Sequence, residues 1–485
     1  MRISDLCPKN VWTIFDEITK VPRPSKHEEK IRQYLREWAT KNNIEFNEDA
    51  TGNIVMHRPA SEGCENAPVL TMQAHMDMVC EKNNDVAFDF MNDPIETVID
   101  GDWVRANGTT LGGDNGIGMA GAMAALVDDS IKHGPLEALF TVDEETGLTG
   151  AFALEENFIK GKYLINLDSE DEGEVFVGCA GGIDTVATLP YSTEVVPEGY
   201  HFMKITVDGL KGGHSGCDIH LGLGNSIKIL SRFMVSWMRN YPLYLISFEG
   251  GNLRNAIPRE ASAVVAIPKE DKEFITIALN IFAGNVADEL KGVDDDFRMR
   301  WESCERSEAI EQKTAFALIN ALNACAQGVM AMSKDIEGLV ETSTNLASVK
   351  MSEHGKFVIS TSQRSSVESA KYAVGFSVES AFALAGADVT HSDGYPGWKP
   401  NMDSSILKTT VDTYEQLFGE KPAIKAIHAG LECGLFKSKY PNLDMISFGP
   451  TIRGVHSPTE RLHIPAVANF YKHLVAIIEK VAEEK

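Results

Sequence analysis

Apolar runs of strand length alternate with helical patterns over the first part of the chain, and this alternation restricts the fold more than any other feature. The residue patterns predict strands over 53–59, 67–79, 136–145 and 163–171, and a helix over 116–129 that follows a glycine-rich turn. Strands that alternate with helices predict an α/β fold with a mostly parallel sheet sandwiched by helices. In such sheets, binding and catalytic residues gather at the carboxyl ends of the strands.

Another helix is predicted over 25–42, where Ile31, Leu35 and Trp38 recur at helical spacing. Ser25 and Glu28 have the spacing of a capping box, in which Ser25 caps the helix and Glu28 reaches back to it.

The pattern changes near Val186. A strand–helix–strand–strand–helix order follows, and a helix, a hairpin and a second helix come later, so a duplicated α+β unit is plausible. The stretch 391–405 is rich in Pro, Gly and Asp, which is typical of a linker. We therefore predict two domains: a discontinuous one formed by 1–185 and 396–485, and an inserted one formed by 186–395.

The composition excludes several classes of partner. The 485 residues carry a net charge of −25 and contain no long basic run, which argues against nucleic acid and anionic membranes as partners. No stretch approaches the roughly 20 apolar residues that span a bilayer, and the N-terminus lacks the apolar core of a signal peptide. The eight scattered cysteines contain no C-x-x-C and favour a reducing compartment, so we expect a cytoplasmic protein.

Acidic residues and a histidine stand where predicted strands end. Asp143, Glu144 and Glu145 follow an apolar run, and three adjacent carboxylates at a strand end need cations to neutralise them. His75 and Asp77 lie two residues apart on one strand face, which puts their positions roughly 7 Å apart. This pattern fits a metal-bound histidine oriented by a carboxylate, although H-x-D alone fits a structural pair equally well.

Three more residues extend this pattern. Asp114 lies in "LGGDNG" before a helix, Asp168 ends another strand, and His456 lies in a loop before the last helix. Taken singly, they are read as a helix cap, a solvated loop acid and a surface histidine. The loop around Asp114 lacks the Lys-Ser/Thr of a P-loop, and its acidic residue would repel phosphate.

Together, His75, Asp114, Glu145, Asp168 and His456 supply five nitrogen and oxygen ligands, enough for two metal ions if one carboxylate bridges them. Paired metal ions roughly 3.5–4 Å apart are typical of the active sites of hydrolytic enzymes. Glu144 is then free to act as a general base.

The combination H-x-D, G-G-D-N-G, D-E-E-x-G, the Asp of "NLDSED" and a late loop His resembles the co-catalytic zinc aminoacylase/dipeptidase/carboxypeptidase family. The resemblance extends through "GGHSG", "NLRNAIPRE" and "HAGLECG", and covers essentially the whole chain. It implies a catalytic domain with an inserted α+β lid, two Zn²⁺ ions per subunit for which Co²⁺ or Mn²⁺ can substitute, and a homodimer.

The resemblance also implies individual roles. Asp114, followed by a cis peptide, bridges the ions; His75 and Asp168 complete one site, and Glu145 and His456 the other. Asp77 orients His75, and Glu144 serves as general base and then acid. The implied substrate-binding residues lie in or near the lid: His214 at the oxyanion, Asn255, Arg364 at the terminal carboxylate, and Gly430 along the substrate backbone. On sequence alone, Arg364 reads as a surface residue and His214 as a turn residue.

The implied activity is hydrolysis of unblocked dipeptides, preferentially Xaa-His including β-alanyl-histidine. An N-acyl amino acid deacylase or carboxypeptidase of the same family is the alternative within hydrolases. A metal- or peptide-binding protein that has lost catalysis is the alternative outside them, and the intact Glu144 argues against it.

Overall fold

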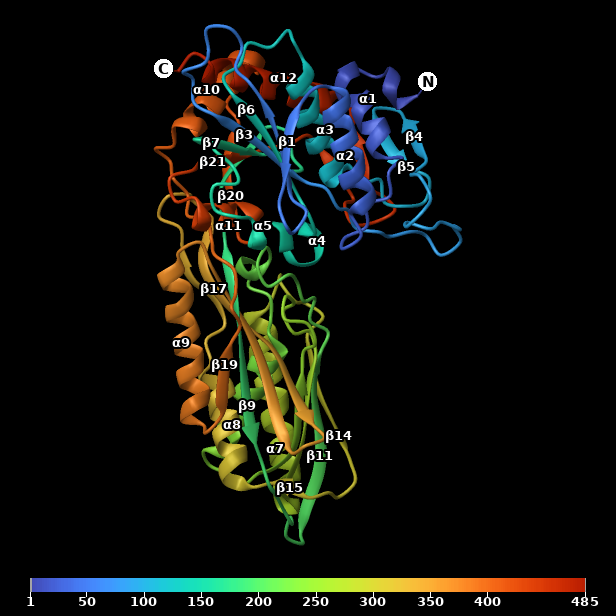
Figure 1. Ribbon diagram of the computed structural model, residues 1–485. Coiled ribbons are helices and arrows are strands. Elements are labelled where there is room, and N and C mark those ends of the chain that lie inside the picture. The colour runs from blue at the N-terminus through green and yellow to red at the C-terminus, as the bar shows by residue number, and fades with distance from the viewer. Residues whose placement is uncertain (1, 485) are drawn as a thin grey trace. The chain divides into compact units, whose positions relative to one another are not determined.

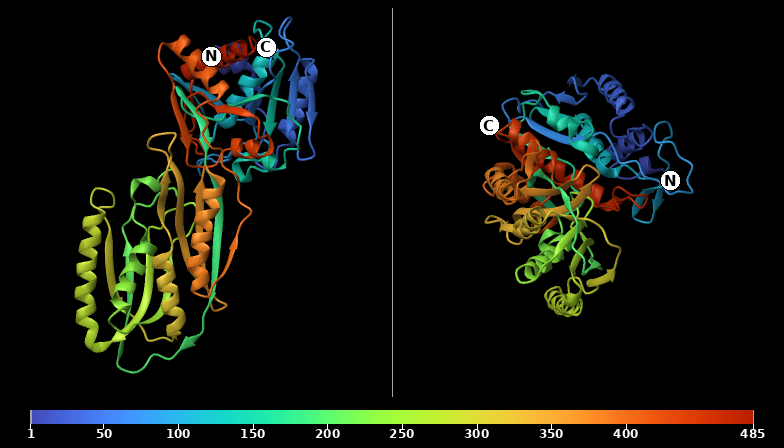
Figure 2. Two further views of the ribbon diagram at one scale, coloured as in Figure 1. Left: turned by 90° about the vertical axis from the view of Figure 1, so that its left-hand side faces the viewer. Right: turned by 90° about the horizontal axis from the view of Figure 1, so that it is seen from below.

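The computed structural model describes residues 2–484 and divides into two compact units (Figures 1 and 2). Unit 1 runs from the start of the described chain to Gly178 and adds Pro400–Ala426 and the part from Leu431 onward. Unit 2 consists of Cys179–Lys399 and Ile427–Gly430, and the predicted inserted segment 186–395 falls inside it. Within 2–484, no helix combines the length and the apolar character needed to cross a bilayer.

Unit 1 is built on an eight-stranded sheet with the order β1-β2-β6-β3-β7-β21-β8-β20. These strands are β1 (Glu45–Glu48), β2 (Ile54–Arg58), β3 (Leu70–His75), β6 (Leu136–Thr141), β7 (Tyr163–Asn166), β8 (Glu174–Cys179), β20 (Ala423–Ile427) and β21 (Asp444–Ser447). The pairs β6–β3, β3–β7 and β7–β21 are parallel, whereas β1–β2, β2–β6 and β21–β8 are antiparallel. The α/β prediction is confirmed, with the parallel strands at the centre of a mixed sheet.

Helices and a small second sheet complete unit 1. The helices are α1 (Lys9–Ile18), α2 (Glu29–Lys41), α3 (Gly113–Val127), α4 (Glu144–Gly147), α5 (Thr149–Ala153), α10 (Ser405–Phe418), α11 (Glu432–Lys439) and α12 (Ile464–Val481), with a short 3-10 turn at Ile3–Asp5. The small sheet joins β4 (Thr97–Asp100), β5 (Trp103–Ala106), β22 (Ile452–Arg453) and β23 (Arg461–His463). Helix α3 is buried along nearly its whole length and packs against β3, β6 and α1. Its many Ala and Gly residues and its flexible Met side chains permit this close approach.

The predicted capping box at Ser25 and Glu28 is wrong, although helix α2 forms beside it. The Ser25 hydroxyl donates to Asp77 Oδ2 at 2.8 Å, and Glu28 accepts the backbone N–H groups of Lys26 at 2.8 Å and Asp143 at 3.1 Å. Tertiary partners therefore replace the local cap.

Unit 2 contains a nine-stranded sheet whose main path runs β14-β11-β13-β12-β17-β18-β9-β19, with β16 paired to β17. Its strands are β9 (Gly181–Pro190), β11 (Tyr200–Asp208), β12 (Tyr244–Gly250), β13 (Ala261–Pro268), β14 (Arg298–Ser303), β16 (Gly328–Met332), β17 (Val340–Ser352), β18 (Lys356–Ser365) and β19 (Asp388–His391). A separate two-stranded ladder pairs β10 (Thr193–Glu194) with β15 (Ala309–Ile310). The long β17–β18 hairpin carries Arg364 near its open end.

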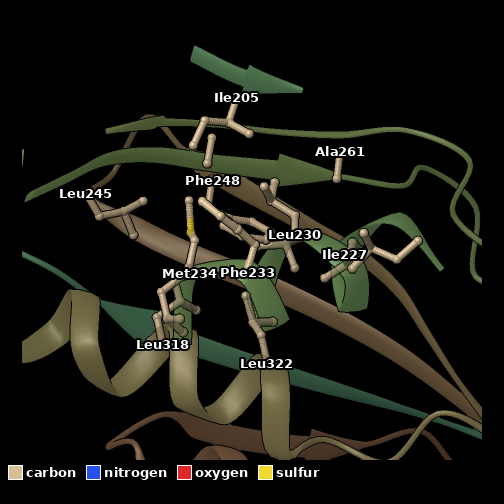
Figure 3. Packing of buried hydrophobic residues seen from close by; sticks show 14 of the residues in the cluster. Ile205, Ile227, Leu230, Phe233, Met234, Leu245, Phe248, Ala261, Leu318 and Leu322 are labelled. Atoms are coloured by element: carbon tan, nitrogen blue, oxygen red, sulfur yellow. The ribbon is translucent and has the colours of Figure 1, made fainter. Parts of the chain in front are cut away.

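Four longer helices accompany this sheet: α6 (Ser226–Met238), α7 (Lys272–Glu289), α8 (Gln312–Ala324) and α9 (Glu368–Leu384), with 3-10 turns at Ile219–Leu221 and Lys269–Asp271. Figure 3 shows how Phe233 and Leu230 of α6 pack between Phe248 of the sheet and Leu318 and Leu322 of α8. The unit thus has its own continuous hydrophobic core. The duplication within this unit stays a prediction.

Candidate metal centre

The centre of the parallel sheet places two candidate ligands at one edge. His75 is the last residue of β3, and Asp168 follows β7 by two residues. Because β3 and β7 are parallel neighbours, their carboxyl ends meet at the same edge of the sheet. Asp114 arrives from the start of α3, where the Asp114–Asn115 peptide is cis as expected, and His456 arrives from the loop between β22 and β23.

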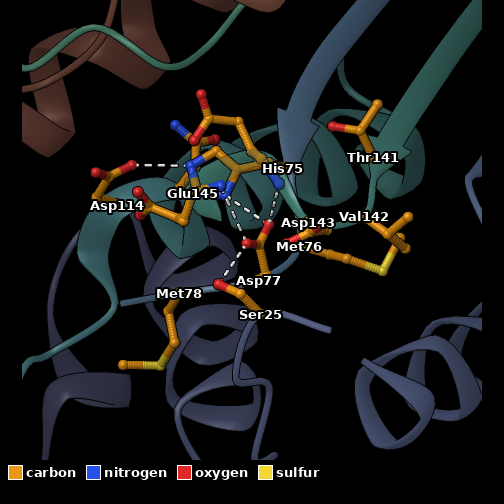
Figure 4. Close-up of polar contacts among 12 residues, drawn as sticks. Ser25, His75, Met76, Asp77, Met78, Asp114, Thr141, Val142, Asp143 and Glu145 are labelled. Carbon is orange, nitrogen blue, oxygen red and sulfur yellow. Dashed lines mark hydrogen bonds and ion pairs between the residues drawn. The ribbon is translucent and has the colours of Figure 1, made fainter. Parts of the chain in front are cut away.

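Asp114 lies between the two histidines, and its two oxygens face different partners. Its Oδ1 lies 3.0 Å from His75 Nε2, and its Oδ2 lies 3.3 Å from His456 Nε2 (Figure 4 shows the His75 side). Asp168 Oδ1 lies 3.4 Å from His75 Nε2, and Glu145 Oε2 lies 3.0 Å from His456 Nε2. The five side chains therefore form two groups that share Asp114.

The electrostatics reflect an excess of carboxylates. Burial would lower the pKa of His75, but Asp168, Asp114 and Asp77 outweigh it and raise this pKa well above its ordinary value. Hydrogen bonds to Asp114 and Glu145 raise the pKa of His456 to about 11. Burial, assisted by the neighbouring carboxylates, raises the pKa of Asp168 to about 6. Groups that bind protons this firmly favour any cation placed among them.

Asp77 connects the histidine to the acidic trio. Its Oδ1 lies 3.3 Å from His75 Nδ1, and its two oxygens accept the backbone N–H groups of Glu144 at 3.0 Å and Glu145 at 3.2 Å. Burial opposes ionisation of Asp77, yet His75, Ser25 and these N–H donors lower its pKa to about 2. Asp77 therefore lies beside the imidazole and accepts the first N–H groups of α4 at the same time.

The three acidic residues of the trio have different environments. The Asp143 carboxylate accepts hydrogen bonds from the hydroxyls of Thr146 and Thr149, while its backbone has a left-handed conformation, with φ of 48°. Glu145 faces His456, and its Oε1 is buried without a hydrogen-bond partner among the described residues. The Glu144 carboxylate makes no hydrogen bond or ion pair within 2–484, and burial with nearby Asp168 and Glu432 raises its pKa well above the ordinary value.

These residues fit divalent cations. The ligand atoms of His75, Asp114 and Glu145 lie within 4.8 Å of one another, and a buried Glu145 oxygen has no partner within the described chain. Mixed imidazole and carboxylate donors suit zinc, cobalt and manganese. Each half of the cluster offers one imidazole, one terminal carboxylate and one oxygen of Asp114.

The four residues predicted to bind substrate all lie in unit 2. His214 Nδ1 accepts the N–H groups of Gly216 at 3.2 Å and Cys217 at 3.0 Å, so the neutral ring carries its proton on Nε2 as a donor. The backbone carbonyl of Asn255 accepts the Ser215 N–H at 2.8 Å, whereas the Asn255 side chain is exposed.

Arg364 is buried on β18 rather than at the surface. Its Nη1 donates to the Tyr395 hydroxyl at 3.0 Å, while its Nε is buried without a partner within 2–484. The Tyr395 ring also packs on Gly430, where a Cβ would lie 2.9 Å from it. His428 is buried nearby, and its Nε2 lies 2.7 Å from Ser343 Oγ. Burial and the adjacent Arg364 lower the pKa of His428 to about 4.

Two further acids lie beside the metal-ligand candidates. Glu432, at the start of α11, is buried and accepts hydrogen bonds from Gln73 at 2.6 Å and Thr141 at 2.9 Å. Burial raises its pKa to about 8, and burial near Asp114 and Asp168 raises the pKa of Glu170 to about 7. Glu432 lies in the "HAGLECG" segment of the resemblance, which gave it no role, and the acidic pair of Glu170 and Asp171 in "NLDSED" was a usable signal for Glu170.

The fold and the cluster define an α/β protein with a preformed site for divalent cations at the edge of its parallel strands. The chain belongs to peptidase family M20/M25/M40, which it matches over residues 71–480. The family resemblance seen in the motifs is thereby confirmed, and with it the assignment to enzymes that hydrolyse peptide bonds.

Individual relatives extend this result. The chain is 43% identical over 481 residues, 99% of both chains, to the cytosol non-specific dipeptidase of Escherichia coli (strain K12). It superimposes with a TM-score of 0.96 on the crystal structure of aminoacylhistidine dipeptidase from Vibrio alginolyticus, with 46% identity over 100% of this chain and 99% of that one. Aminopeptidase PepT from Bacillus cereus shares the fold, with a TM-score of 0.58 at 18% identity over 99% of this chain and 100% of that one.

Proposed function

We propose that this protein is a dinuclear metallo-dipeptidase that hydrolyses unblocked dipeptides, preferentially Xaa-His including β-alanyl-histidine. The names of the two similar dipeptidases support the substrate class. The observation that carries the proposal is the position of Asp114, whose two oxygens face His75 and His456 separately at 3.0 and 3.3 Å. A carboxylate that lies between two imidazoles can bridge two ions, as in a two-metal hydrolase.

The proposed ligands are His75, Asp114 and Asp168 for one ion and His456, Asp114 and Glu145 for the other. Divalent cations bound there supply Lewis-acid polarisation of the peptide carbonyl and lower the pKa of water. Asp77 Oδ1 lies 3.3 Å from His75 Nδ1, so Asp77 would hold the ring in a position from which Nε2 binds the ion.

Glu144 is the proposed general base. It precedes Glu145 on the first turn of α4, and its carboxylate makes no competing hydrogen bond within the described chain. It would take the proton of water as the hydroxide attacks the carbonyl, and later deliver that proton to the leaving amine.

Unit 2 supplies the proposed substrate-binding residues, and we accordingly assign unit 1 as the catalytic domain and unit 2 as the lid. The Nε2–H of His214 would donate to the oxyanion. Arg364 would pair with the terminal carboxylate, for which its Nε, buried without a hydrogen-bond partner among the described residues, is a suitable donor. Asn255 and Gly430 would contact the substrate backbone.

We further propose zinc as the native metal, a homodimer as the assembly and the cytoplasm as the location. The donor set supports zinc without excluding cobalt or manganese. The location is supported by the name of the Escherichia coli relative. Elemental analysis of the purified protein and light scattering coupled to size-exclusion chromatography test the first two.

A substrate panel on zinc-loaded protein tests the activity. The panel contains β-alanyl-histidine, alanyl-histidine, alanyl-alanine, their N-acetylated forms and simple N-acetyl amino acids. We expect turnover of the unblocked dipeptides and a loss of roughly 100-fold or more on N-acetylation, as when a charged hydrogen bond is removed. Comparable rates on N-acetyl amino acids would favour a deacylase, and two bound metals without any turnover would favour a binding protein.

A further inference from the structure

Glu460 lies between β22 and β23 and makes a set of contacts that the proposed chemistry does not use. Its side chain is buried, and its carboxylate accepts four consecutive backbone N–H groups. Oε2 accepts those of Leu111 at 2.7 Å and Gly112 at 3.0 Å, and Oε1 accepts those of Gly113 at 2.7 Å and Asp114 at 3.2 Å. The turn that carries Asp114 is thus wrapped around one carboxylate.

The glycines of this turn are explained by the same contacts. Gly112 has a φ of +70°, a left-handed conformation that only glycine adopts readily. A Cβ on Gly113 would lie 3.2 Å from Glu460 Oε1 and 3.0 Å from Leu462 Cγ. The turn therefore has the form of an anion-binding nest, and its anion is a side chain of the same chain.

Arg23 holds the carbonyl side of the turn. Its guanidinium is fully buried and donates to the backbone carbonyl of Gly112. It also donates to the carbonyls of Met76 at 3.1 Å and Asp77 at 2.7 Å, directly after His75. Arg23 thus ties the Asp114 turn to the end of β3, and Glu460 ties the same turn to the loop that carries His456.

From these contacts we infer that Glu460 is a positioning residue of the metal centre, which fixes Asp114 relative to His456 through the backbone of Leu111–Asp114. Glu460 is four residues from His456, so one short loop carries both a ligand and the group that holds the opposing ligand. The inference rests on the proposed metal centre. It predicts that the geometry of the centre depends on a carboxylate that touches neither metal nor substrate.

Glu460→Gln tests this inference because it keeps the shape of the side chain and removes its ability to accept from all four donors. One oxygen becomes an NH₂ group that faces two backbone N–H groups. Glu137→Gln is the matched control: Glu137 is an equally buried glutamate of β6 that accepts a backbone N–H, from Lys160, and the hydroxyl of Thr71.

Two readouts do not depend on activity. In metal-free protein, hydrogen exchange of the amides of 111–114 should accelerate at least tenfold in Glu460→Gln and stay unchanged in Glu137→Gln. In a Co²⁺ titration followed by visible absorption, at least one of two equivalents should bind 10–100-fold more weakly, the usual effect of removing a group that orients a ligand. With the metals saturating, kcat should fall at least tenfold while KM stays within twofold.

Unchanged Co²⁺ affinity in Glu460→Gln would overturn the inference, even if exchange accelerates, because Glu460 would then only stabilise the fold. If this variant does not fold, Gly113→Ala takes its place, since the added Cβ displaces the carboxylate without changing charge. In Gly113→Ala we expect faster amide exchange and weaker Co²⁺ binding as well, with smaller changes than in Glu460→Gln. Co²⁺ affinity equal to that of the wild type would equally overturn the inference. Absence of dipeptidase activity in the wild type would contradict the proposed function, while the exchange and Co²⁺ results would still decide the role of Glu460.

Discussion

Adjacent carboxylates in this site have separate environments, and this separation allows binding and chemistry to be tested independently. Glu145 faces His456 at 3.0 Å, whereas the neighbouring Glu144 makes no hydrogen bond or ion pair within 2–484. Glu144→Gln should therefore retain both metal equivalents and lose activity by roughly 10²–10⁴-fold, the usual contribution of a general base. Elemental analysis and kcat measurements check this, with the exposed Glu156→Gln as control. Near-normal turnover in Glu144→Gln would show that another group takes the proton.

Arg364 provides a second test at this scale, because its proposed role concerns affinity for the substrate. Arg364→Lys keeps the charge but loses the planar fork and the Nε donor, which is buried without a hydrogen-bond partner in the part of the chain that the structure describes. We expect KM for dipeptides to rise roughly 10-fold or more, as a charged hydrogen bond is lost, with kcat changed much less. Dipeptide amides, which lack the carboxylate, should be poor substrates for the wild type and respond little to the change. An equal effect on acids and amides would contradict carboxylate recognition.

At the scale of elements, the strands and the position of candidate ligands at their ends could be predicted because both depend on local pattern. The apolar run 136–141 forms β6, and the acids that follow lie beyond it, as charge at the end of a buried strand requires. The environment of Ser25 could not be predicted, since Asp77, 52 residues away, competes with the local cap. Glu460 and Arg23 were missed for the same reason: they bind backbone groups far along the chain, which no spacing reveals.

Helix α4 gives a prediction at this scale, because Asp77 accepts the first N–H groups of the helix and is also the proposed positioning residue for His75. Asp77→Ala should weaken metal binding roughly 10–100-fold, in addition to the roughly 0.5–2 kcal/mol of stability that a helix cap contributes. Asn225→Ala in unit 2 is the matched control, since Asn225 accepts the N–H groups of Ile227 and Lys228 at the start of α6. Denaturation and metal titration of both variants separate the effects. Metal affinity reduced equally in both would indicate a general loss of structure.

The contact between α10 and α12 should make stability depend on pH. His473 on α12 donates from Nε2 to the Thr410 carbonyl at 2.9 Å, and its ring packs among Tyr414, Phe418 and Phe448. Burial lowers its pKa to about 4, below the unfolded value of about 6.5, so the unfolded chain binds the additional proton between these values. The contribution of His473 to the free energy of unfolding is therefore complete above pH 6.5. It decreases as the pH falls towards 4, by about 3 kcal/mol in all.

His473→Gln should remove this part of the pH dependence, because glutamine can donate to Thr410 without titrating. Unfolding midpoints at pH 7 and pH 5 measure it, and His473→Gln should lose less stability between them than the wild type. The exposed His354→Gln should behave as the wild type. A steeper dependence in His473→Gln would contradict a neutral, buried imidazole.

At the scale of the whole molecule, the five candidate ligands all belong to unit 1, whereas unit 2 has its own hydrophobic core. Metal that binds only the folded state stabilises it by about 2.7 kcal/mol when present at 100 times Kd. Chelation should therefore lower the unfolding temperature of unit 1 by roughly 5–10 °C for a unit of this size, whereas β11 and β13 of unit 2 should be unaffected. Calorimetry with and without chelator gives the shift, and hydrogen exchange assigns it to residues.

The candidate ligands His75, Asp114, Glu145, Asp168 and His456 come from five separate segments joined through Asp114. On chelation, protection from hydrogen exchange should therefore be lost in all five segments together. Loss confined to one segment, or equal loss in β11 and β13, would contradict a shared metal centre.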